Sequence, residues 1–291
     1  MSETLRYVAP AKINLGLTVH GRRPIDGYHE LETVFYRVLE PHDTLTVTPS
    51  AFFRFSCSNA SLPVDDRNLV MRAANLFAET LGVPLPAIDV HLEKRIPMGA
   101  GLGGGSSDAA TMLQILEEQT PGCGPGAIRK ISDIGRRLGA DIPFFLSGAH
   151  MAHATGIGET LTPIDLELGR SILILFDPKI SVSTKDAYAD LKRGIDPAHH
   201  AERPSLDAHA IAVATEQAVR SGTMTNDFEP SVFARHPRLL SMKQQLLQAG
   251  AKSALMTGSG AAMFGLFRDM TRALAARDHF AKQEGLLTFL S

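Results

Sequence analysis

A glycine-rich stretch at residues 97–107 carries the clearest chemical signal in this chain. Alternating apolar and polar residues at 88–96 predict a strand before it, and helix-forming residues at 106–119 predict a helix after it. Glycine lets peptide N–H groups approach a ligand closely, because no β-carbon stands in the way. Unpaired N–H groups at the positively polarised start of a helix bind phosphate well. The stretch therefore indicates a phosphate-binding loop.

Ser106 and Ser107 follow the glycines, where their hydroxyls are expected to cap the helix or to face a phosphate. The plainer alternative is a tight connection between a strand and a helix, but such a connection needs only one or two glycines. Residues 99–104 fit the dinucleotide pattern G-x-G-x-x-G, yet the second strand that should follow the helix is missing. A Walker A loop requires a lysine where Gly105 stands. Neither of these nucleotide-binding loops fits.

A second candidate is the polar face of a strand near the start of the chain. Apolar and polar residues alternate over 12–20, so Lys12 and Asn14 share one face with Gly16. Such a face is either solvated or lines a site. Its composition favours the solvated interpretation, whereas a glycine inside a strand favours the close approach of a ligand or another backbone.

Three further polar residues have both a plain and a functional interpretation. Asp141 stands among apolar neighbours, and with Pro143 two residues later the pattern favours a helix N-cap over a catalytic base. Tyr28 stands at the end of a loop that has an Asp-Gly turn signal, where its ring is available to stack on a base. Packing is the commoner role of a loop tyrosine. His29 beside it is more often an incidental polar residue than a catalyst.

Two more segments are weak candidates when each is taken alone. Residues 257–261 resemble a plain hairpin turn between two short apolar strands. His199 and His200 suggest a metal site only faintly, because no further ligand stands at a recognisable spacing, and a solvated loop is the simpler interpretation.

Composition limits the class of protein. The chain has 291 residues, 44% of them hydrophobic and 21% charged, and a net charge of −2. These values predict a globular protein of two domains, with no nucleic acid and no anionic membrane as partner. Cys57 and Cys123 are the only cysteines, so we expect reduced thiols rather than a disulfide framework. The N-terminus has no leader pattern and no run is long enough to span a membrane, which predicts a cytoplasmic location.

The elements that would position these residues follow from periodicity and from Gly and Pro signals. Strands are expected at 4–22, 31–39, 44–48, 52–56, 88–96, 172–176, 253–256, 262–267 and 286–290, and a strand or hairpin at 150–161. Helices are expected at 69–81, 106–119, 127–138, 183–192, 205–221, 270–283 and, interrupted by Pro230 and Pro237, at 227–249. The domain boundary is predicted near residue 165, giving domains 1–165 and 166–291.

Three motifs taken together resemble the signature motifs of the GHMP kinases in order and spacing. They occupy residues 10–15, 97–110 and 256–261, so the resemblance spans almost the whole chain. It implies an α+β fold of two domains: an N-terminal domain like domain 2 of ribosomal protein S5 and a ferredoxin-like C-terminal domain. It also implies that ATP, with Mg²⁺, is the phosphoryl donor.

Four stretches are similar to one branch of this superfamily, at residues 26–31, 99–107, 138–143 and 226–230. Members of that branch use ATP to phosphorylate the 2-hydroxyl of a cytidine diphosphate-linked methylerythritol in the non-mevalonate route to isoprenoid precursors. The resemblance implies this small molecule as substrate, for an enzyme that is a monomer or a weak homodimer. The nearest rival is a homoserine or mevalonate-type kinase, which needs no cytosine site. A nucleotide-binding module without catalysis and an NAD-dependent oxidoreductase are the remaining alternatives.

The resemblance also implies roles for individual residues. Asp141 would be the catalytic base, Lys12 its charged partner, and Asn14 a group that places the substrate. The cytosine would be held by Tyr28, His29 and Tyr188, and the substrate side would be closed by Gly258, Ser259 and Gly260. The ATP-binding residues would be Pro97, Gly99, Ala100, Gly101, Leu102, Gly103, Gly104, Gly105, Ser106 and Ser107. The loop at 22–25 is slightly longer than the family pattern, and no magnesium ligand is implied.

Overall fold

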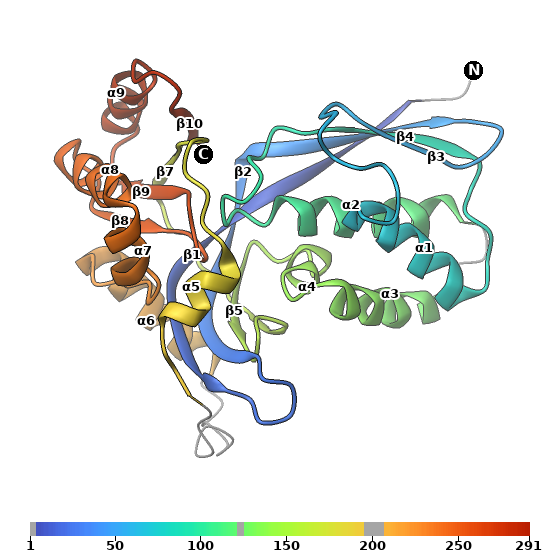
Figure 1. Cartoon of the computed structure of the whole chain (residues 1–291), viewed down its shortest axis with the longest axis horizontal. Coiled ribbons are helices and arrows are strands. Elements are labelled where there is room, and N and C mark those ends of the chain that lie inside the picture. Colours follow the sequence, from blue (N-terminus) through green and yellow to red (C-terminus); the bar gives the residue numbers. More distant parts are fainter. Residues whose placement is uncertain (1–3, 121–124, 195–206) are drawn as a thin grey trace. The chain divides into compact units, whose positions relative to one another are not determined.

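A computed structural model describes residues 4–120, 125–194 and 207–291 (Figure 1). The chain forms two compact units, and each is built from separated stretches of sequence. Unit 1 takes its described residues from 1–11, 41–98 and 103–148, and unit 2 takes its own from 12–40, 99–102 and 149–291. The domain boundary near residue 165 remains a prediction.

Ten strands are described. They are β1 (Leu5–Arg22), β2 (His29–Pro49), β3 (Arg54–Cys57), β4 (Ile88–Glu93), β5 (Met151–Thr155), β6 (Thr160–Pro163), β7 (Ser171–Phe176), β8 (Ser253–Met256), β9 (Met263–Phe267) and β10 (Leu287–Leu290). The described helices are α1 (Leu69–Leu81), α2 (Gly104–Gln119), α3 (Pro125–Leu138), α4 (Ile142–Leu146), α5 (Thr184–Asp190), α6 (Ala208–Ser221), α7 (Glu229–Arg235), α8 (Pro237–Gln248) and α9 (Met270–Phe280).

The strands form two sheets. One has the order β3-β4-β2-β5-β6, with β1 paired to β2, and the other has the order β10-β7-β9-β8. Strand β2 pairs with β4 through residues 44–49, which belong to unit 1, and with β5 through residues 33–36, which belong to unit 2. The mixed helix and sheet class expected from the sequence is confirmed.

In unit 1, the helices α1 to α4 pack on one another and lie on one side of β3 and β4 (Figure 1). Helix α1 begins where the Asn68 side chain accepts a hydrogen bond from the Val70 amide, and it ends at Gly82 in a left-handed conformation. Its apolar face buries Phe77 completely. This helix follows the sequence prediction, because cap, apolar face and glycine stop all agree.

In unit 2, the four-stranded sheet is covered by helices α8 and α9 (Figure 1). Every residue of β7 is buried, and Ile174 pairs with Phe264 of β9 in the core. Asp269 caps α9 by accepting a hydrogen bond from the Thr271 amide. Buried strands of this kind read as continuous apolar runs, which is why their positions can be predicted from the sequence.

Of three predicted interruptions at prolines or turns, two are wrong and one is confirmed. The strands expected at 31–39 and 44–48 are one continuous strand, β2. Pro41 does not interrupt it, because the φ angle of proline is compatible with extended backbone. The interruption expected at Pro237 within 227–249 is confirmed, since His236 precedes it and adopts φ −127°, outside the helical region, between α7 and α8. Pro230 does not interrupt the segment, because it stands in the first turn of α7.

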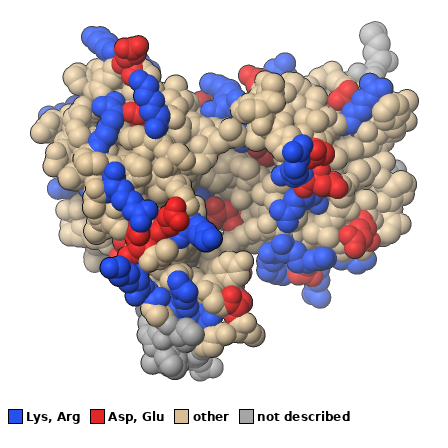
Figure 2. Space-filling model, viewed as in Figure 1, with Lys and Arg blue, Asp and Glu red and all other residues tan. Residues whose placement is uncertain are grey.

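Charged side chains of both signs are interspersed over the face seen in Figure 2, in keeping with the net charge of −2. Among the described helices, none combines the length and the apolar character that crossing a membrane requires.

Candidate active site

The glycine loop takes a backbone shape that only glycine adopts easily. Gly99, Gly101 and Gly103 have φ values of 66°, 76° and 72°, all in the left-handed region. Helix α2 then begins at Gly104, with Gly103 as its N-cap residue and no side chain capping it. The expectation that Ser106 or Ser107 caps this helix is therefore wrong. Both serines lie inside the first turns, because the glycines after 103 take helical conformation.

The start of α2 fits a phosphate group. The first amide bonded within the helix is that of Ser107, which donates to the Gly103 carbonyl at 2.9 Å. The preceding amides, from Gly104 to Ser106, have no acceptor in the helix, and its first turn holds no acidic residue. A β-carbon added at Gly105 would meet nothing within 4 Å, so the backbone there faces open space. These observations support the expected phosphate-binding loop.

The first half of the loop, residues 99–102, packs on the 257–262 turn within unit 2. The Ala262 amide donates to the Ala100 carbonyl at 3.0 Å, and the Ala261 amide donates to the Gly99 carbonyl at 3.3 Å. A β-carbon on Gly101 would lie 2.2 Å from the Thr257 carbonyl oxygen. The backbone of the glycine loop and that of the 257–262 turn, about 150 residues apart in the chain, are therefore closely packed, so a change in one displaces the other.

Gly101→Ala is expected to displace this contact. The new methyl group would overlap the Thr257 carbonyl and would also hold an alanine in left-handed backbone, so kcat/KM for ATP should fall by on the order of 10²-fold. Steady-state kinetics with ATP as the varied substrate measures this fall. Gly82→Ala is the matched control, since it imposes the same φ strain at a position with nothing within 4 Å. Equal kinetics in the two variants would contradict the argument.

Lys12 and Asn14 lie together in a buried polar network on β1. The Lys12 Nζ donates to Asn14 Oδ1 at 2.8 Å, and only 4% of Lys12 is exposed. The Asn14 side-chain amide donates to Thr33 Oγ1 at 3.0 Å, while the Thr257 hydroxyl donates to Asn14 Oδ1 at 3.1 Å. The solvated interpretation of this strand face is therefore wrong, because strand β2 and residue 257 cover it.

The predicted closing residues stand next to this network. Gly258 and Gly260 have φ values of 56° and 102°, and the turn that they form connects β8 with β9. The Asn226 side-chain amide holds the turn by donating to the carbonyls of Met256 and Gly258, at 2.7 and 2.8 Å. Ser259 Oγ lies 2.9 Å from Thr184 Oγ1 at the start of α5.

Aromatic rings gather at the predicted cytosine site. His29 and Tyr188 are stacked with centroids 5.0 Å apart and an angle of 25° between the rings, and Phe228 meets Tyr188 edge-on at 4.9 Å. Burial lowers the pKa of His29 below its usual value, and the charge of Arg22 lowers that pKa further. The imidazole is therefore neutral at pH 7, so one ring nitrogen can donate while the other accepts.

Tyr28 is placed differently from the other two aromatic candidates. It is 62% exposed, and its amide donates to the Asp26 carboxylate at 3.0 Å in the turn that precedes it. Its ring makes no described stacking contact with His29 or Tyr188. The structure thus brings His29 and Tyr188 together and leaves Tyr28 open to solvent.

Asp141 occupies the N-cap position of α4 with Pro143 in the first turn, as predicted. Its side chain makes no capping hydrogen bond, so the helix start does not depend on the carboxylate. Asp141 belongs to unit 1 and Lys12 to unit 2. Their partnership in catalysis remains a proposal.

A metal centre built from protein side chains would need several ligands close together. Over residues 4–120, 125–194 and 207–291, no group of three or more His, Cys, Asp and Glu side chains is arranged to hold a metal ion. His199 and His200 lie outside the described residues.

Three residues of the network were not predicted as site residues. Thr257 and Asn226 each stand inside a motif, but only the fold shows that their side chains meet β1 or the closing turn. Thr33 stands on β2, where alternation could have marked it as a buried polar residue.

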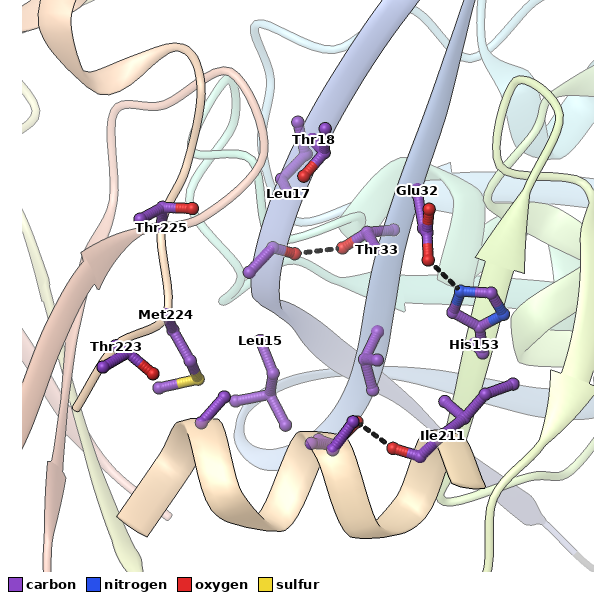
Figure 3. A pocket seen from close by; sticks show the side chains of 15 residues that line it. Leu15, Leu17, Thr18, Glu32, Thr33, His153, Ile211, Thr223, Met224 and Thr225 are labelled. Atoms are coloured by element: carbon purple, nitrogen blue, oxygen red, sulfur yellow. Dashed lines mark hydrogen bonds and ion pairs between the residues drawn. The ribbon is translucent and has the colours of Figure 1, made fainter. Parts of the chain in front are cut away.

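A separate pocket of about 260 Å³ lies between α6 and strands β1, β2 and β5 of unit 2 (Figure 3). Its wall includes Leu15, Met224 and the His153 ring, which contacts Glu32 at 3.0 Å. Thr33 also lines it and donates to the Gly16 carbonyl at 2.6 Å (Figure 3). None of the predicted site residues is among those that line this pocket.

Comparison with known proteins identifies the family. The GHMP kinases N terminal domain model matches residues 68–149, and the GHMP kinases C terminal model matches residues 210–285. A 4-diphosphocytidyl-2-C-methyl-D-erythritol kinase from Salinibacter ruber is 41% identical over 273 residues, which cover 92% of this chain and 92% of that protein.

Solved structures agree with these matches. The crystal structure of a 4-(cytidine 5'-diphospho)-2C-methyl-D-erythritol kinase is 36% identical, with a TM-score of 0.78 and 98% of both chains covered. The homoserine kinase from Cytophaga hutchinsonii shares the fold alone, at 19% identity and a TM-score of 0.68, over 100% of this chain and 95% of its own. The resemblance seen in the motifs is confirmed, and the chain belongs to the GHMP kinases, in the family of the 4-diphosphocytidyl-2-C-methyl-D-erythritol kinases.

Proposed function

We propose that this chain transfers the γ-phosphoryl group of ATP to the 2-hydroxyl of 4-diphosphocytidyl-2-C-methyl-D-erythritol, a step of the non-mevalonate route to isoprenoid precursors. The observation that carries the proposal is that the buried Asn14 Oδ1 accepts hydrogen bonds from both the Lys12 ammonium and the Thr257 hydroxyl. It joins the first and the third motif of the family in one polar network. A buried ammonium beside oriented amide and hydroxyl groups suits a reaction that moves a highly charged phosphoryl group.

The nucleotide phosphates would bind the glycine loop. The free amides from Gly104 to Ser106 and the dipole of α2 supply positive potential without a side chain. Magnesium in kinases is commonly bound through substrate phosphates plus one or two carboxylates, so the lack of a described metal cluster fits such binding. When bound, the ion offsets phosphate charge.

The base would be Asp141. Its carboxylate is not used to cap α4, and in the reaction it would accept the proton of the substrate hydroxyl as the oxygen attacks the γ-phosphorus in line. The bond to the β-phosphate oxygen breaks as the new bond forms, and ADP leaves. The ammonium of Lys12 would offset charge on the phosphoryl group.

The cytosine would bind at His29 and Tyr188. A neutral imidazole has one donor and one acceptor nitrogen, and Nε2 of His29 accepts from Arg22 Nε at 3.3 Å. The edge of the base would displace this bond and pair with the imidazole, which Tyr188 holds by stacking on it. Tyr28 directly precedes His29 in the sequence, and its ring is exposed. It would close on the base when substrate is present.

Tyr28→Ala is expected to weaken substrate binding by about 1–3 kcal/mol, the usual value of one base stack, while kcat stays near normal. The change should appear in KM for the cytidyl substrate and not in KM for ATP. Phe52→Ala is the control, because it truncates another exposed ring, one that belongs to none of the proposed binding sites. An unchanged KM in Tyr28→Ala would place the cytosine elsewhere.

The proposed function is tested by ADP release from ATP and magnesium with the cytidyl substrate, beside methylerythritol that lacks the cytidyl group. Turnover with the cytidyl substrate alone is the expected result. Turnover with neither acceptor would leave a GHMP kinase whose acceptor is another alcohol, such as homoserine or mevalonate.

We further propose that the enzyme acts in the cytoplasm, where ATP and a nucleotide-linked intermediate are available, as a monomer or weak homodimer that uses neither nucleic acid nor membrane. Gel filtration with light scattering measures the oligomeric state.

A further inference from the structure

We propose that Asp43, Lys94 and Asp108 form a buried clamp that joins the two ends of the glycine loop and so fixes the loop amides that bind the nucleotide phosphates. This inference rests on the proposed function, since it assigns positioning residues to the same phosphate site. None of the three was predicted from the sequence to belong to the site.

The three side chains form one compact charge cluster in unit 1. The Lys94 ammonium donates to a carboxylate oxygen of Asp43 and to Asp108 Oδ2, the latter at 2.7 Å. The exposed fractions of the three side chains are 6% for Lys94, 0% for Asp43 and 3% for Asp108. Burial makes such a cluster rigid, because none of these three polar groups can turn to water.

The cluster reaches both ends of the loop. Asp43 Oδ1 accepts hydrogen bonds from the amides of Arg95 and Ile96, at 2.5 and 2.7 Å, directly before the loop begins. Asp108 stands in the second turn of α2, directly after the loop ends. Lys94 links the two carboxylates. A stretch rich in glycine has high conformational entropy when its ends are free, so anchoring both ends lowers the cost of ordering its amides.

The first turn of α2 rests on this cluster. A β-carbon on Gly104 would lie 2.8 Å from the Ile96 side chain and 3.0 Å from Lys94 Nζ. Gly104 is therefore required by close packing on the clamp, whereas Gly105 faces open space. The amides at the start of α2 take their position from Lys94 and its partners.

The two carboxylates are not equivalent. Asp43 has three donors, namely the Lys94 ammonium and two backbone amides. Asp108 Oδ1 is buried without a hydrogen-bond partner in the part of the chain that the structure describes. Burial, with Asp43 beside it, raises the pKa of Asp108, so the neutral acid is favoured there. Burial alone would lower the pKa of Lys94, but the two carboxyl groups outweigh it and raise that pKa, so the amine stays protonated.

This difference gives a matched pair of variants. Asp108→Asn replaces a neutral acid by a neutral amide, and its oxygen can still accept from Lys94. Asp43→Asn places an amide N–H₂ group either against the Lys94 ammonium or against the Arg95 and Ile96 amides, so one pair of donors must face each other. Asp177→Asn is the external control, since Asp177 is also a buried carboxylate, with Arg238 and the Lys179 amide as partners.

The experiment measures Kd for ATP and ADP by calorimetry, and hydrogen exchange of the 95–107 segment, in the full-length variants. Asp43→Asn is expected to raise the Kd of both ATP and ADP by about ten- to a hundredfold and to speed hydrogen exchange in the 95–107 segment. Asp108→Asn, whose amide oxygen can still accept from Lys94, should weaken binding of ATP and ADP less than Asp43→Asn does. Asp177→Asn, which lies outside the clamp, should bind both nucleotides like the unchanged enzyme. If Asp43→Asn yields no folded protein, Lys94→Gln takes its place with the same expected losses.

Two results would overturn the clamp. One is unchanged nucleotide affinity in Asp43→Asn or in its substitute. The other is equal weakening in all three aspartate variants with faster exchange throughout the chain, because that pattern reports general destabilisation. Neither nucleotide binding nor hydrogen exchange requires turnover. If the unchanged enzyme did not phosphorylate the cytidyl substrate, the proposed function would be wrong, but the proposed clamp could still be tested.

Discussion

Asp141→Asn is expected to fold like the unchanged protein and to lower kcat by about 10²–10⁴, the usual contribution of a general base. The substitution keeps the size of the side chain and removes its ability to accept a proton. Because the Asp141 side chain makes no capping bond to α4, the change removes no helix cap. Asparagine is also an accepted N-cap residue, so the free energy of unfolding should change little.

The measurement is ADP release at saturating ATP and cytidyl substrate, beside thermal unfolding. Asp133→Asn is the matched control, since it makes the same chemical change at an exposed residue of α3 that pairs with Arg136. It should leave kcat unaltered. Near-normal kcat in Asp141→Asn would remove this residue from the mechanism and leave the hydroxyl proton to another group.

Lys12→Met is expected to lower kcat by about 10²–10³, with a smaller effect on either KM, because its charge is needed most when the phosphoryl group is in transfer. Only 4% of Lys12 is exposed, so its charge acts in surroundings of low dielectric constant. Methionine keeps the length and the apolar stem. Asn14 Oδ1 loses one donor but keeps the Thr257 hydroxyl, which limits the loss of stability.

Lys282→Met controls for loss of a positive charge, because Lys282 is an exposed residue beyond the end of α9. The decisive quantity is the division of the effect between kcat and KM. A variant with normal kcat and a raised KM for the cytidyl substrate would show that Lys12 binds the ground state and does not stabilise the transition state.

The elements set by local signals can be predicted from the sequence. Helix α1 has a cap, an apolar face and a glycine stop within its own residues, and β7 is a short apolar run. The glycine loop is recognisable for the same reason, because its backbone shape needs glycine at positions that the chain itself displays. Motif order and spacing then indicate the family, which the comparisons confirm.

The start of α2 marks where local signals mislead the prediction. Serine is a common N-cap, so the pattern favours Ser106 or Ser107, yet Gly103 holds that position. Packing of Gly104 on Ile96 and Lys94 decides the start, and a local propensity does not report packing.

Burial of the charged and amide side chains at the site is decided by the tertiary structure. Lys12 and Asn14 read as a solvated face, because in the sequence a polar residue at every second position looks the same whether water or a second strand covers it. Thr257, which covers Asn14, is 243 residues away. Lys94 directly follows β4, between the charged residues Glu93 and Arg95, so the sequence does not mark it as buried. The partners that it meets in the core stand 51 residues before it and 14 after it.

The sequence by itself therefore determined which backbone shapes and which chemical groups this kinase has. The tertiary structure decided which of those groups are removed from water and paired. The physical reason is that backbone conformation depends mainly on neighbours along the chain, whereas burial and charge pairing depend on residues that only folding brings together.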